Sequence, residues 1–344
     1  MPDYKNDTLE HVSSPGYSAP PRKQGKLKAH FRRFWWLHLI IFIIGFLLVL
    51  LLLMFVGIPN IAQNGINDAE LELESQVVMD PTPDSVQLAM TTISKSKSSF
   101  EPWLDSFEAA LFLEGPEPIQ PFGYITIPRV KATHRSIIFV NQTLEIKNLR
   151  QFEEYNKVVM NSETYRVGIR GRMGLKQGGF PKTNVNFNKI VTSKGLNKLA
   201  GFKVLDFNIS LSREPDGTNM IGKVSIPNAS PITLQMGDVT LDLFVDGTSI
   251  GNSTLKDLTL KPGENIAEMR SNTDQAGVIT AIMKKYHDGI IPVDIVGRWS
   301  VYQGKHLTYY EAALQSNPMR TMLDVGPALA GMGVNISSLV PPKR

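Results

Sequence analysis

The sequence predicts a mainly β protein: one N-terminal transmembrane helix followed by two tandem antiparallel β-sandwich domains, each with one helix. Three observations predict this fold. A charge-free apolar run covers residues 34–56, apolar and polar residues alternate through much of the remaining chain, and a similar order of motifs occurs twice. Alternation with a period of two is typical of half-buried strands, and many strands with few helices favour antiparallel sandwiches over a doubly wound sheet.

The apolar run FWWLHLIIFIIGFLLVLLLLMFV, Phe34 to Val56, contains no Asp, Glu, Lys or Arg. At about 1.5 Å per residue, a helix of this length spans the roughly 30 Å hydrocarbon layer of a bilayer. A buried core helix rarely runs this far without a polar face, and a cleaved signal peptide would have a shorter apolar region and a small-residue cleavage site. We therefore predict a membrane anchor.

The charges on either side of this run predict its orientation. Basic residues crowd the N-terminal side, whereas the first basic residue after the run is Lys95. The positive-inside bias then places the N-terminus in the cytosol and the C-terminal domains in the lumen, as in a type II signal-anchored protein. Residues 1–33 are predicted to form a disordered, basic cytosolic tail. Its basic cluster either contacts anionic lipid heads or serves only as a topology signal; its members are Arg22, Lys23, Lys26, Lys28, Arg32 and Arg33.

The remaining composition excludes several functions. The chain has no cysteine, which rules out disulfides, thiolate metal sites and cysteine nucleophiles. The formal net charge of +4 equals the surplus of residues 1–33, so the rest of the chain is balanced. Charge therefore gives no support to a nucleic-acid-binding face.

Alternating stretches predict the strands and the faces that they bury. The stretch AELELES places Leu71 and Leu73 on one face, and VTLDLFV at 239–245 buries every second residue. In KVLDFNISL at 203–211, one face carries Asn208 with other polar residues, and the opposite face carries Leu205, Phe207, Ile209 and Leu211.

Two stretches have helical periodicity, NLRQFEEYNKVVM at 148–160 and NTDQAGVITAIMKKYH at 272–287. A turn, strands, a helix and a hydrophobic-Gly-Arg strand occur twice in the same order, with unequal spacing. We place the boundary between the copies near SREPDGTN, 212–219. The predicted domains are therefore a first sandwich at 60–212, a second at 213–326 and a flexible C-terminus at 327–344.

Five sequons follow the apolar run and are glycosylation candidates if this part of the chain is lumenal. Asn228 is the weakest, because Pro231 follows its serine. The other candidates are Asn141, Asn208, Asn252 and Asn335.

The segment VDGTSIG, 245–251, contains the G-x-S-x-G spacing of many serine hydrolases. A nucleophile elbow needs a strand, a strained turn and then a helix. Here Asp-Gly lies between alternating apolar runs, which is a strong hairpin signal, and the following NSTLKDLTLKPG has no helical period. A hydrolase that uses Ser249, with Asp274 and His287 following in chain order, is therefore only a distant alternative. The six histidines show no metal-ligand spacing, and we expect no enzyme, cofactor or metal.

Several motifs together resemble a fungal, membrane-anchored family of unknown function of the DUF3712 type. They are GIPNIAQNGINDAELELESQVVMDPTPDSVQLAM, NMIGKVSIPN, LTLKPGEN and YYEAAL, and the resemblance covers about residues 57–325. The family is similar to the late-embryogenesis-abundant type 2 (LEA-2) β-sandwich, which is immunoglobulin-like. It includes the C-terminal part of a fungal vacuolar protein that helps terminate autophagy. The resemblance implies a vacuolar or other endomembrane location and a lipid held in the sandwich, and it carries over no catalytic residue.

Two hypotheses about function follow. The first is a lumenal module that binds lipid or another apolar ligand. The segment PMRTMLDVGPALAGMGV, 318–334, is rich in Met and Gly and is flexible enough to cover the opening of such a ligand site. A final strand followed by a frayed end is an equally good interpretation of this segment. The second is a membrane-tethered scaffold without a small-molecule ligand.

Overall fold

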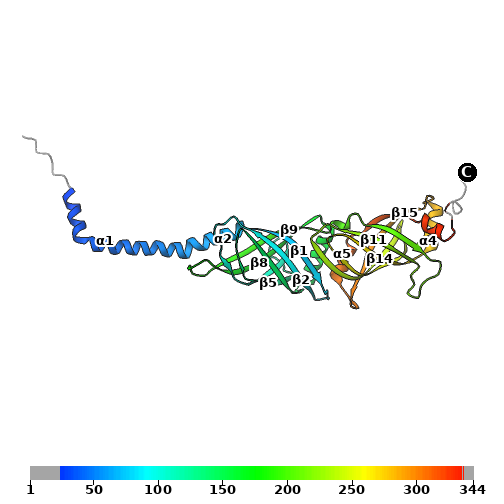
Figure 1. Ribbon diagram of the computed structural model, residues 1–344, viewed down its shortest axis with the longest axis horizontal. Coiled ribbons are helices and arrows are strands. Elements are labelled where there is room, and N and C mark those ends of the chain that lie inside the picture. The colour runs from blue at the N-terminus through cyan, green and yellow to red at the C-terminus, as the bar shows by residue number, and fades with distance from the viewer. Residues whose placement is uncertain (1–23, 335, 337–344) are drawn as a thin grey trace, which may run out of the picture. The chain divides into compact units, whose positions relative to one another are not determined.

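The computed structural model describes the backbone of residues 24–334 and 336, and side chains from residue 32 onward (Figure 1). The chain divides into two compact units, residues 1–57 and residues 58–344. Most of the predicted basic tail and the candidate Asn335 lie outside the described residues. Helix α1 begins at Gln24, so it includes the last part of the segment predicted to be disordered.

The first unit contains α1 (Gln24–Leu52) and a π-helical turn, η1 (Leu53–Gly57). The helical segment Arg32–Asp68 contains a window with a mean hydropathy of 3.5, and none of that window is buried within the protein. This segment is long and apolar enough to cross a membrane. The predicted apolar helix is confirmed, and it is consistent with a single-pass anchor.

The second unit contains two sheets. The six-stranded sheet has the order β5-β4-β8-β3-β6, with β9 beside β8, and the eleven-stranded sheet has the order β10-β11-β14-β13-β12-β1-β2-β7, with β15 beside β12, β16 and β17. The strands of the smaller sheet are β3 (Trp103–Leu104), β4 (Phe107–Leu113), β5 (Gly123–Ile127), β6 (Val130–Lys131), β8 (Thr164–Lys176) and β9 (Thr183–Lys194). Those of the larger sheet are β1 (Glu70–Met79), β2 (Ser85–Lys95), β7 (Arg135–Glu145), β10 (Lys203–Ile209), β11 (Met220–Asn228), β12 (Ile232–Val245), β13 (Thr248–Leu260), β14 (Gly263–Thr273), β15 (Ile290–Tyr302), β16 (Lys305–His306) and β17 (Met319–Asp324).

The predicted mainly β, sandwich-like fold is confirmed, but one strand pair joins its two halves. We call the strands before β10 the first half, and β10 with the later strands the second half. β1 pairs in parallel with β12, with Gln76 opposite Ile232 and Val78 opposite Leu234. Every other strand pair in the described residues is antiparallel. β10 precedes the boundary expected from sequence, yet it pairs with β11. The larger sheet therefore runs through both halves, and β10 belongs with the later strands.

Both predicted helices are present, and the second unit contains further helices. In α3 (Leu149–Asn161) the Asn148 side chain caps the first turn, and in α4 (Gln275–Lys284) the Asp274 side chain does so. The second unit also has a 3₁₀ turn, η2 (Asn197–Leu199), and three further helices: α2 (Ile58–Asp68), α5 (Thr308–Gln315) and α6 (Gly326–Gly331). The expectation of one helix per sandwich was therefore too low.

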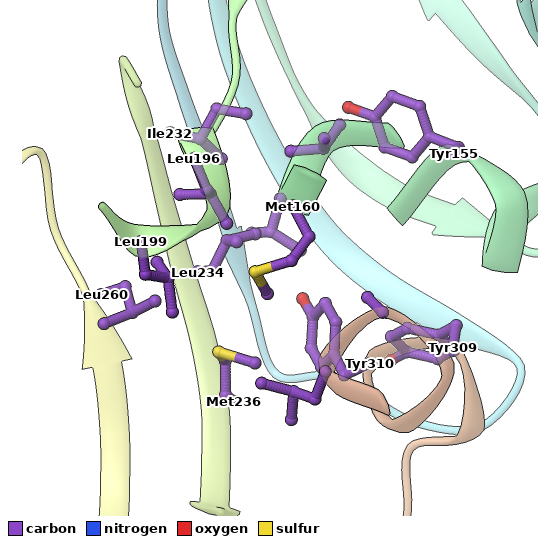
Figure 2. Packing of buried hydrophobic residues seen from close by; sticks show 14 of the residues in the cluster. Tyr155, Met160, Leu196, Leu199, Ile232, Leu234, Met236, Leu260, Tyr309 and Tyr310 are labelled. Atoms are coloured by element: carbon purple, nitrogen blue, oxygen red, sulfur yellow. The ribbon is translucent and has the colours of Figure 1, made fainter. Parts of the chain in front are cut away.

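The core is continuous where the two halves meet, because α3 and α5 pack together there (Figure 2). Tyr309 and Tyr310 on α5 are almost completely buried. The Tyr309 ring lies 4.9 Å from that of Phe152 on α3 and 4.6 Å from that of Tyr310. Its hydroxyl donates a hydrogen bond to the Thr82 carbonyl oxygen at 2.9 Å. One tyrosine thus links α5, α3 and the loop after β1.

The alternation is confirmed for one strand and wrong for part of another. Along β12, the side chains of Val239, Leu241, Leu243 and Val245 are all buried, as predicted. In β10 the register shifts at Leu205, between Val204 and Asp206, and Leu205 is 43% exposed. A β-bulge of this kind inserts one residue and moves the inward positions. Leu211, which follows the strand, is also exposed.

Candidate functional site

An apolar cavity of about 80 Å³ lies beneath α4 and α6 in the second half of the sandwich. We call it the helix-covered pocket. Its floor and walls come from strands β10 to β15 and from β17, and its cover comes from the two helices. Its lining residues are Phe207, Ile209, Leu211, Met220, Leu243, Ile250, Thr273, Gln275, Val278, Ile279, Ile291, Val293, Leu323, Val325, Leu329, Met332 and Val334.

The C-terminal cover of the pocket is built by the Gly- and Met-rich segment. Its first part is β17, which pairs with β15, and its second part is α6. After α6, Gly333 adopts a φ of 77°, and the Val334 amide donates to the Leu329 carbonyl at 2.9 Å. This left-handed turn reverses the chain, so that Val334 lines the pocket with Leu329. The segment therefore forms a final strand, as one interpretation predicts, and a short helix that lines the pocket. Its role as a cover over a ligand site stays a prediction.

The polar side chains in the pocket wall already have hydrogen-bond partners. The Thr273 hydroxyl donates to Asn219 Oδ1 at 3.0 Å, and Gln275 Nε2 donates to the Ser210 carbonyl at 2.7 Å. The remaining lining residues are apolar. A ligand would therefore be held by burial of apolar surface rather than by polar recognition.

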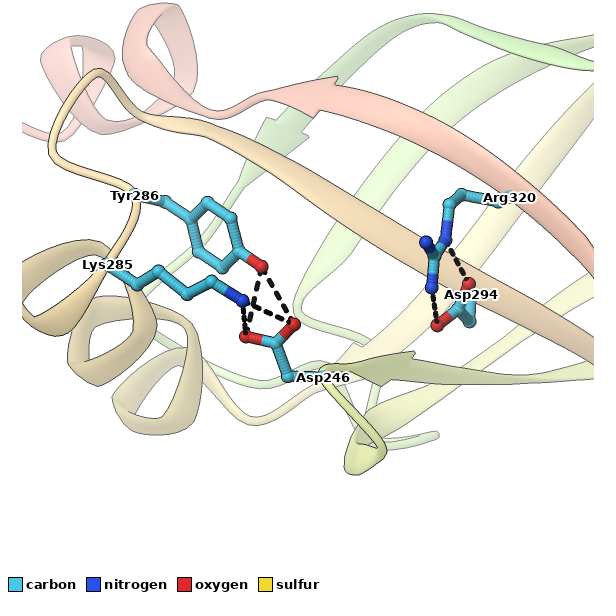
Figure 3. Close-up of polar contacts among 5 residues, drawn as sticks. All are labelled: Asp246, Lys285, Tyr286, Asp294 and Arg320. Atoms are coloured by element: carbon cyan, nitrogen blue, oxygen red, sulfur yellow. Dashed lines mark hydrogen bonds and ion pairs between the residues drawn. The ribbon is translucent and has the colours of Figure 1, made fainter.

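Two largely exposed clusters of charged side chains lie on the elements that form the pocket (Figure 3). Asp246, at the tip of the β12–β13 hairpin, accepts hydrogen bonds of 2.9 Å from Lys285 Nζ and about 3 Å from the Tyr286 hydroxyl, both just after α4. The hydrogen bond from Lys285, followed by that from Tyr286, lowers the pKa of the Asp246 carboxyl. Arg320 on β17 binds both Asp294 carboxylate oxygens, at 2.6 and 2.8 Å, across the β15–β17 pair. The first cluster links the end of α4 to the β12–β13 hairpin, and the second links β17 to β15.

A second cavity, of about 50 Å³, lies in the first half and extends to the junction with the second. Leu88, Leu111 and Ile169 are among its apolar walls, and Tyr310 is among the residues that close it. The Tyr310 hydroxyl has no hydrogen-bond partner in the described residues. This cavity is smaller than the helix-covered pocket, so we regard the helix-covered pocket as the stronger candidate.

The structure places Ser249 in a strand rather than at an elbow. Asp246 and Gly247 form the two-residue turn, with φ values of 48° and 76°, as in a type I′ hairpin. Ser249 follows in β13, opposite Phe244. Asp274 caps α4, and the His287 ring contacts the Ile282 carbonyl oxygen at 3.0 Å. In the described part of the chain, no hydrogen bond joins Ser249 to either residue, and no group of three or more His, Asp or Glu residues is arranged to hold a metal.

The sequons differ in exposure. Asn141 and Asn208 are exposed, and Asn252 is partly buried. Asn228 is 3% exposed, and its amide donates to the Ile232 carbonyl while its oxygen accepts from Ser230. A glycan at Asn228 would displace these contacts. Use of each of the five sequons stays a prediction.

The pocket was only partly foreseen from sequence. The sequence indicates the segment 318–334 as a cover but does not predict the contribution of α4 through Val278 and Ile279. The helical period in 272–287 places Ile279 on one face with Ile282 and Met283. That face was a signal, but periodicity does not tell whether an apolar side chain packs tightly or lines a cavity.

Three solved structures that match the chain are distant from it in sequence and in structure. Red sea bream transglutaminase is 12% identical, with 74% of this chain and 31% of that chain covered and a TM-score of 0.22. A bacterial adhesin from Mobiluncus mulieris with intramolecular cross-links is 10% identical, with 72% and 84% covered and a TM-score of 0.18. The periplasmic chaperone SfaE is 12% identical, with 73% and 98% covered and a TM-score of 0.18. The chain thus spans under a third of the transglutaminase, and TM-scores this low carry no argument about function.

Sequence comparison is more informative for one part of the chain. No curated protein matches the sequence. A protein family does match, over residues 120–243, from just before β5 almost to the end of β12. This match covers part of the region whose motifs resemble a family of unknown function. Over these residues the chain is similar to the DUF3712 family, whose description is a protein of unknown function.

Proposed function

We propose that this protein is a single-pass membrane protein whose β-sandwich binds a lipid or another apolar ligand in the helix-covered pocket. The observation that carries the proposal is the pocket itself, which has apolar walls, satisfied polar groups and a cover made of short helices. The resemblance to vacuolar membrane proteins supports a location in the vacuolar or another endomembrane. In this proposal the sandwich performs no bond-breaking reaction.

Ligand entry requires the cover to move. An apolar cavity of about 150 Å³ is known to hold one benzene molecule, whereas the closed pocket measures about 80 Å³. The α6 cover has six residues and ends at Gly331, with Gly326 at its start. Short terminal segments with few contacts open at low free-energy cost, while strands at the centre of a sheet do not. We infer that α6 lifts and that an acyl chain takes its place against β10 and α4.

A pocket-filling substitution tests this proposal. We expect Ile279→Trp to reduce, several-fold, the labelling of pocket peptides by a photoactivatable fatty acid added to the full-length protein in membranes. The indole would occupy the space that an acyl chain needs. The matched control is Thr280→Trp, because Thr280 is exposed on the same helix and is not part of the pocket wall. Mass spectrometry locates the labelled residues.

Equal labelling of the pocket peptides in all three proteins would contradict lipid binding at this site. So would labelling confined to residues 34–56. The small volume of both cavities favours, in that event, the second hypothesis: a tethered scaffold with a filled interior. A stoichiometric protein partner, found by proximity labelling, would then be expected.

The proposed orientation has its own test. Protease added outside sealed microsomes should remove the basic tail, residues 1–33, and leave the β-sandwich protected. The asymmetry of charge around the anchor supports this orientation. Immunoblotting with tags at each end checks the result. Digestion of the C-terminal part with survival of the tail would reverse the proposed topology.

A further inference from the structure

Three loops of the first half lie together at the end of the sandwich where α2 packs. Gln63 on α2 exchanges two hydrogen bonds of 2.8 Å with the backbone of Asn186 on β9. A side chain at Gly65 would meet Ser98, in the loop after β2. Trp103, which follows that loop, pairs with Lys131 of β6 and with Lys176 at the end of β8. Strand pairing through β3 thus brings segments 96–105, 128–135 and 176–182 together, and Ser98 of the first lies beside α2. We call these segments the loop-tip surface.

Large apolar side chains project from this surface into solvent. Phe100 is 52% exposed, Trp103 43% and Phe180 45%, and each comes from a different loop or strand end. Ile61, on α2, is also 52% exposed. Single exposed apolar residues are ordinary on a protein surface. Here several of them occur at one end of the unit, and aromatic residues predominate.

The same segments are basic. They contain six Lys or Arg residues and two acidic ones, Glu101 and Asp105. Glu101 pairs with Lys131 at 2.9 Å, and Asp105 pairs with Lys182 at 2.6 Å. Lys97, Arg135 and Lys176 form no salt bridge within the described residues. The Arg129 guanidinium lies 4.6 Å from the centre of the Trp103 ring, so a cation and an aromatic ring form one amphipathic group.

The course of the chain ties this surface to the anchor. α2 begins at Ile58, immediately after the apolar segment, and has 11 residues. At about 1.5 Å per residue it is only about 16 Å long. Only α2 and Ala69 thus separate the apolar segment from β1, and Ser98 of the loop-tip surface lies beside α2. Aromatic side chains mixed with Lys and Arg are the residues that settle at the membrane–water interface, where rings lie at headgroup level and cations meet phosphates.

We propose that the loop-tip surface docks on the bilayer that holds its own anchor, with Phe100, Trp103 and Phe180 inserted at the interface. The basic side chains contact lipid phosphates. Docking of this kind restricts the sandwich to one orientation above the membrane. The proposal requires the anchor but does not require the helix-covered pocket to bind a ligand.

The absence of cysteine allows a direct test in the full-length protein. Phe100→Cys and Phe180→Cys, each labelled with an environment-sensitive NBD probe, are reconstituted in phosphatidylcholine vesicles that carry a spin-labelled headgroup quencher. The control is Ile266→Cys, because Ile266 is 64% exposed on β14 in the second half. We expect several-fold stronger quenching and blue-shifted emission at positions 100 and 180 than at position 266.

Quenching at positions 100 and 180 equal to that at position 266 would overturn the proposal. Flotation with the vesicles reports anchoring separately, so failure to dock is distinguishable from failure to insert. Labels that are exposed in vesicles but shielded in native membranes would identify a protein as the occupant of this surface, which also overturns the proposal.

A second experiment tests the basic side chains. Phosphatidylserine in the vesicles should increase quenching at position 100. The double substitution Lys97→Glu and Lys176→Glu should cancel that increase, whereas Lys256→Glu, at an exposed position, should not. An increase that survives the double substitution would contradict the role assigned to these lysines.

Discussion

Replacing Gly251 by alanine is expected to destabilise the sandwich severely. Gly251 has a φ of 126°, a conformation that residues with a Cβ rarely adopt. A Cβ at this position would also lie 2.0 Å from the backbone oxygen of Asn272 on the neighbouring β14. Strained backbone alone costs about 1–3 kcal/mol, and relief of the clash requires β13 and β14 to separate. Thermal unfolding of the full-length protein in detergent measures the effect.

The matched control lies two residues away, in the same G-x-S-x-G spacing. Ser249→Ala removes an exposed hydroxyl from β13 and should change the free energy of unfolding by no more than about 0.5 kcal/mol. A Gly251→Ala protein as stable as the wild type would contradict the structural explanation of this glycine. Any esterase activity of the preparation should be the same with and without Ser249; its loss in Ser249→Ala would revive the hydrolase alternative.

Tyr309→Ala is expected to have an effect of similar size by a different mechanism. Tyr309 is fully buried and packs against Phe152 and Tyr310 at the junction of the halves. Removing a buried aromatic side chain typically costs about 3–5 kcal/mol, because transfer free energy is lost and a cavity remains. Here the cavity would open between α3 and α5. Unfolding followed by near-ultraviolet circular dichroism, which reports the packing of the tyrosines, measures the loss.

Tyr309→Phe separates the hydrogen bond from the packing. It keeps the ring and leaves the Thr82 carbonyl without this donor. We expect a loss of about 1–2 kcal/mol, the usual effect of leaving one buried partner unpaired. If the Ala and Phe substitutions cost the same, the ring contacts contribute nothing and the packing argument fails.

Local rules predicted the strands well where a strand is regular. The buried residues of β12 follow strict alternation, which the sequence displays directly. β10 departs from it because the bulge at Leu205 shifts the inward positions, and no residue in KVLDFNISL signals that bulge. The helices α3 and α4 are recognisable because each repeats an apolar face along its sequence, and each begins after a capping side chain. α5 and α6, with eight and six residues, are too short for periodicity to stand out.

The features that depend on contacts distant in sequence could not be predicted. The parallel pairing of β1 with β12 joins residues that are more than 150 positions apart, and neither strand contains a signal for its partner. The helix-covered pocket has the same origin, since β10, α4 and α6 meet only in the folded chain. The family resemblance suggested a ligand within the sandwich but did not indicate which walls would enclose it.

The pairing of β1 with β12 has a consequence for how this chain can be divided. A fragment that ends near residue 212 would leave the backbone groups of Gln76, Val77 and Val78 without the strand that they face, and such a free edge invites association with other chains. It would also lack α5, whose tyrosines fill the space beside α3. Duplicated motifs in the chain thus do not correspond to interchangeable modules, and recombination at their border would yield two incomplete proteins.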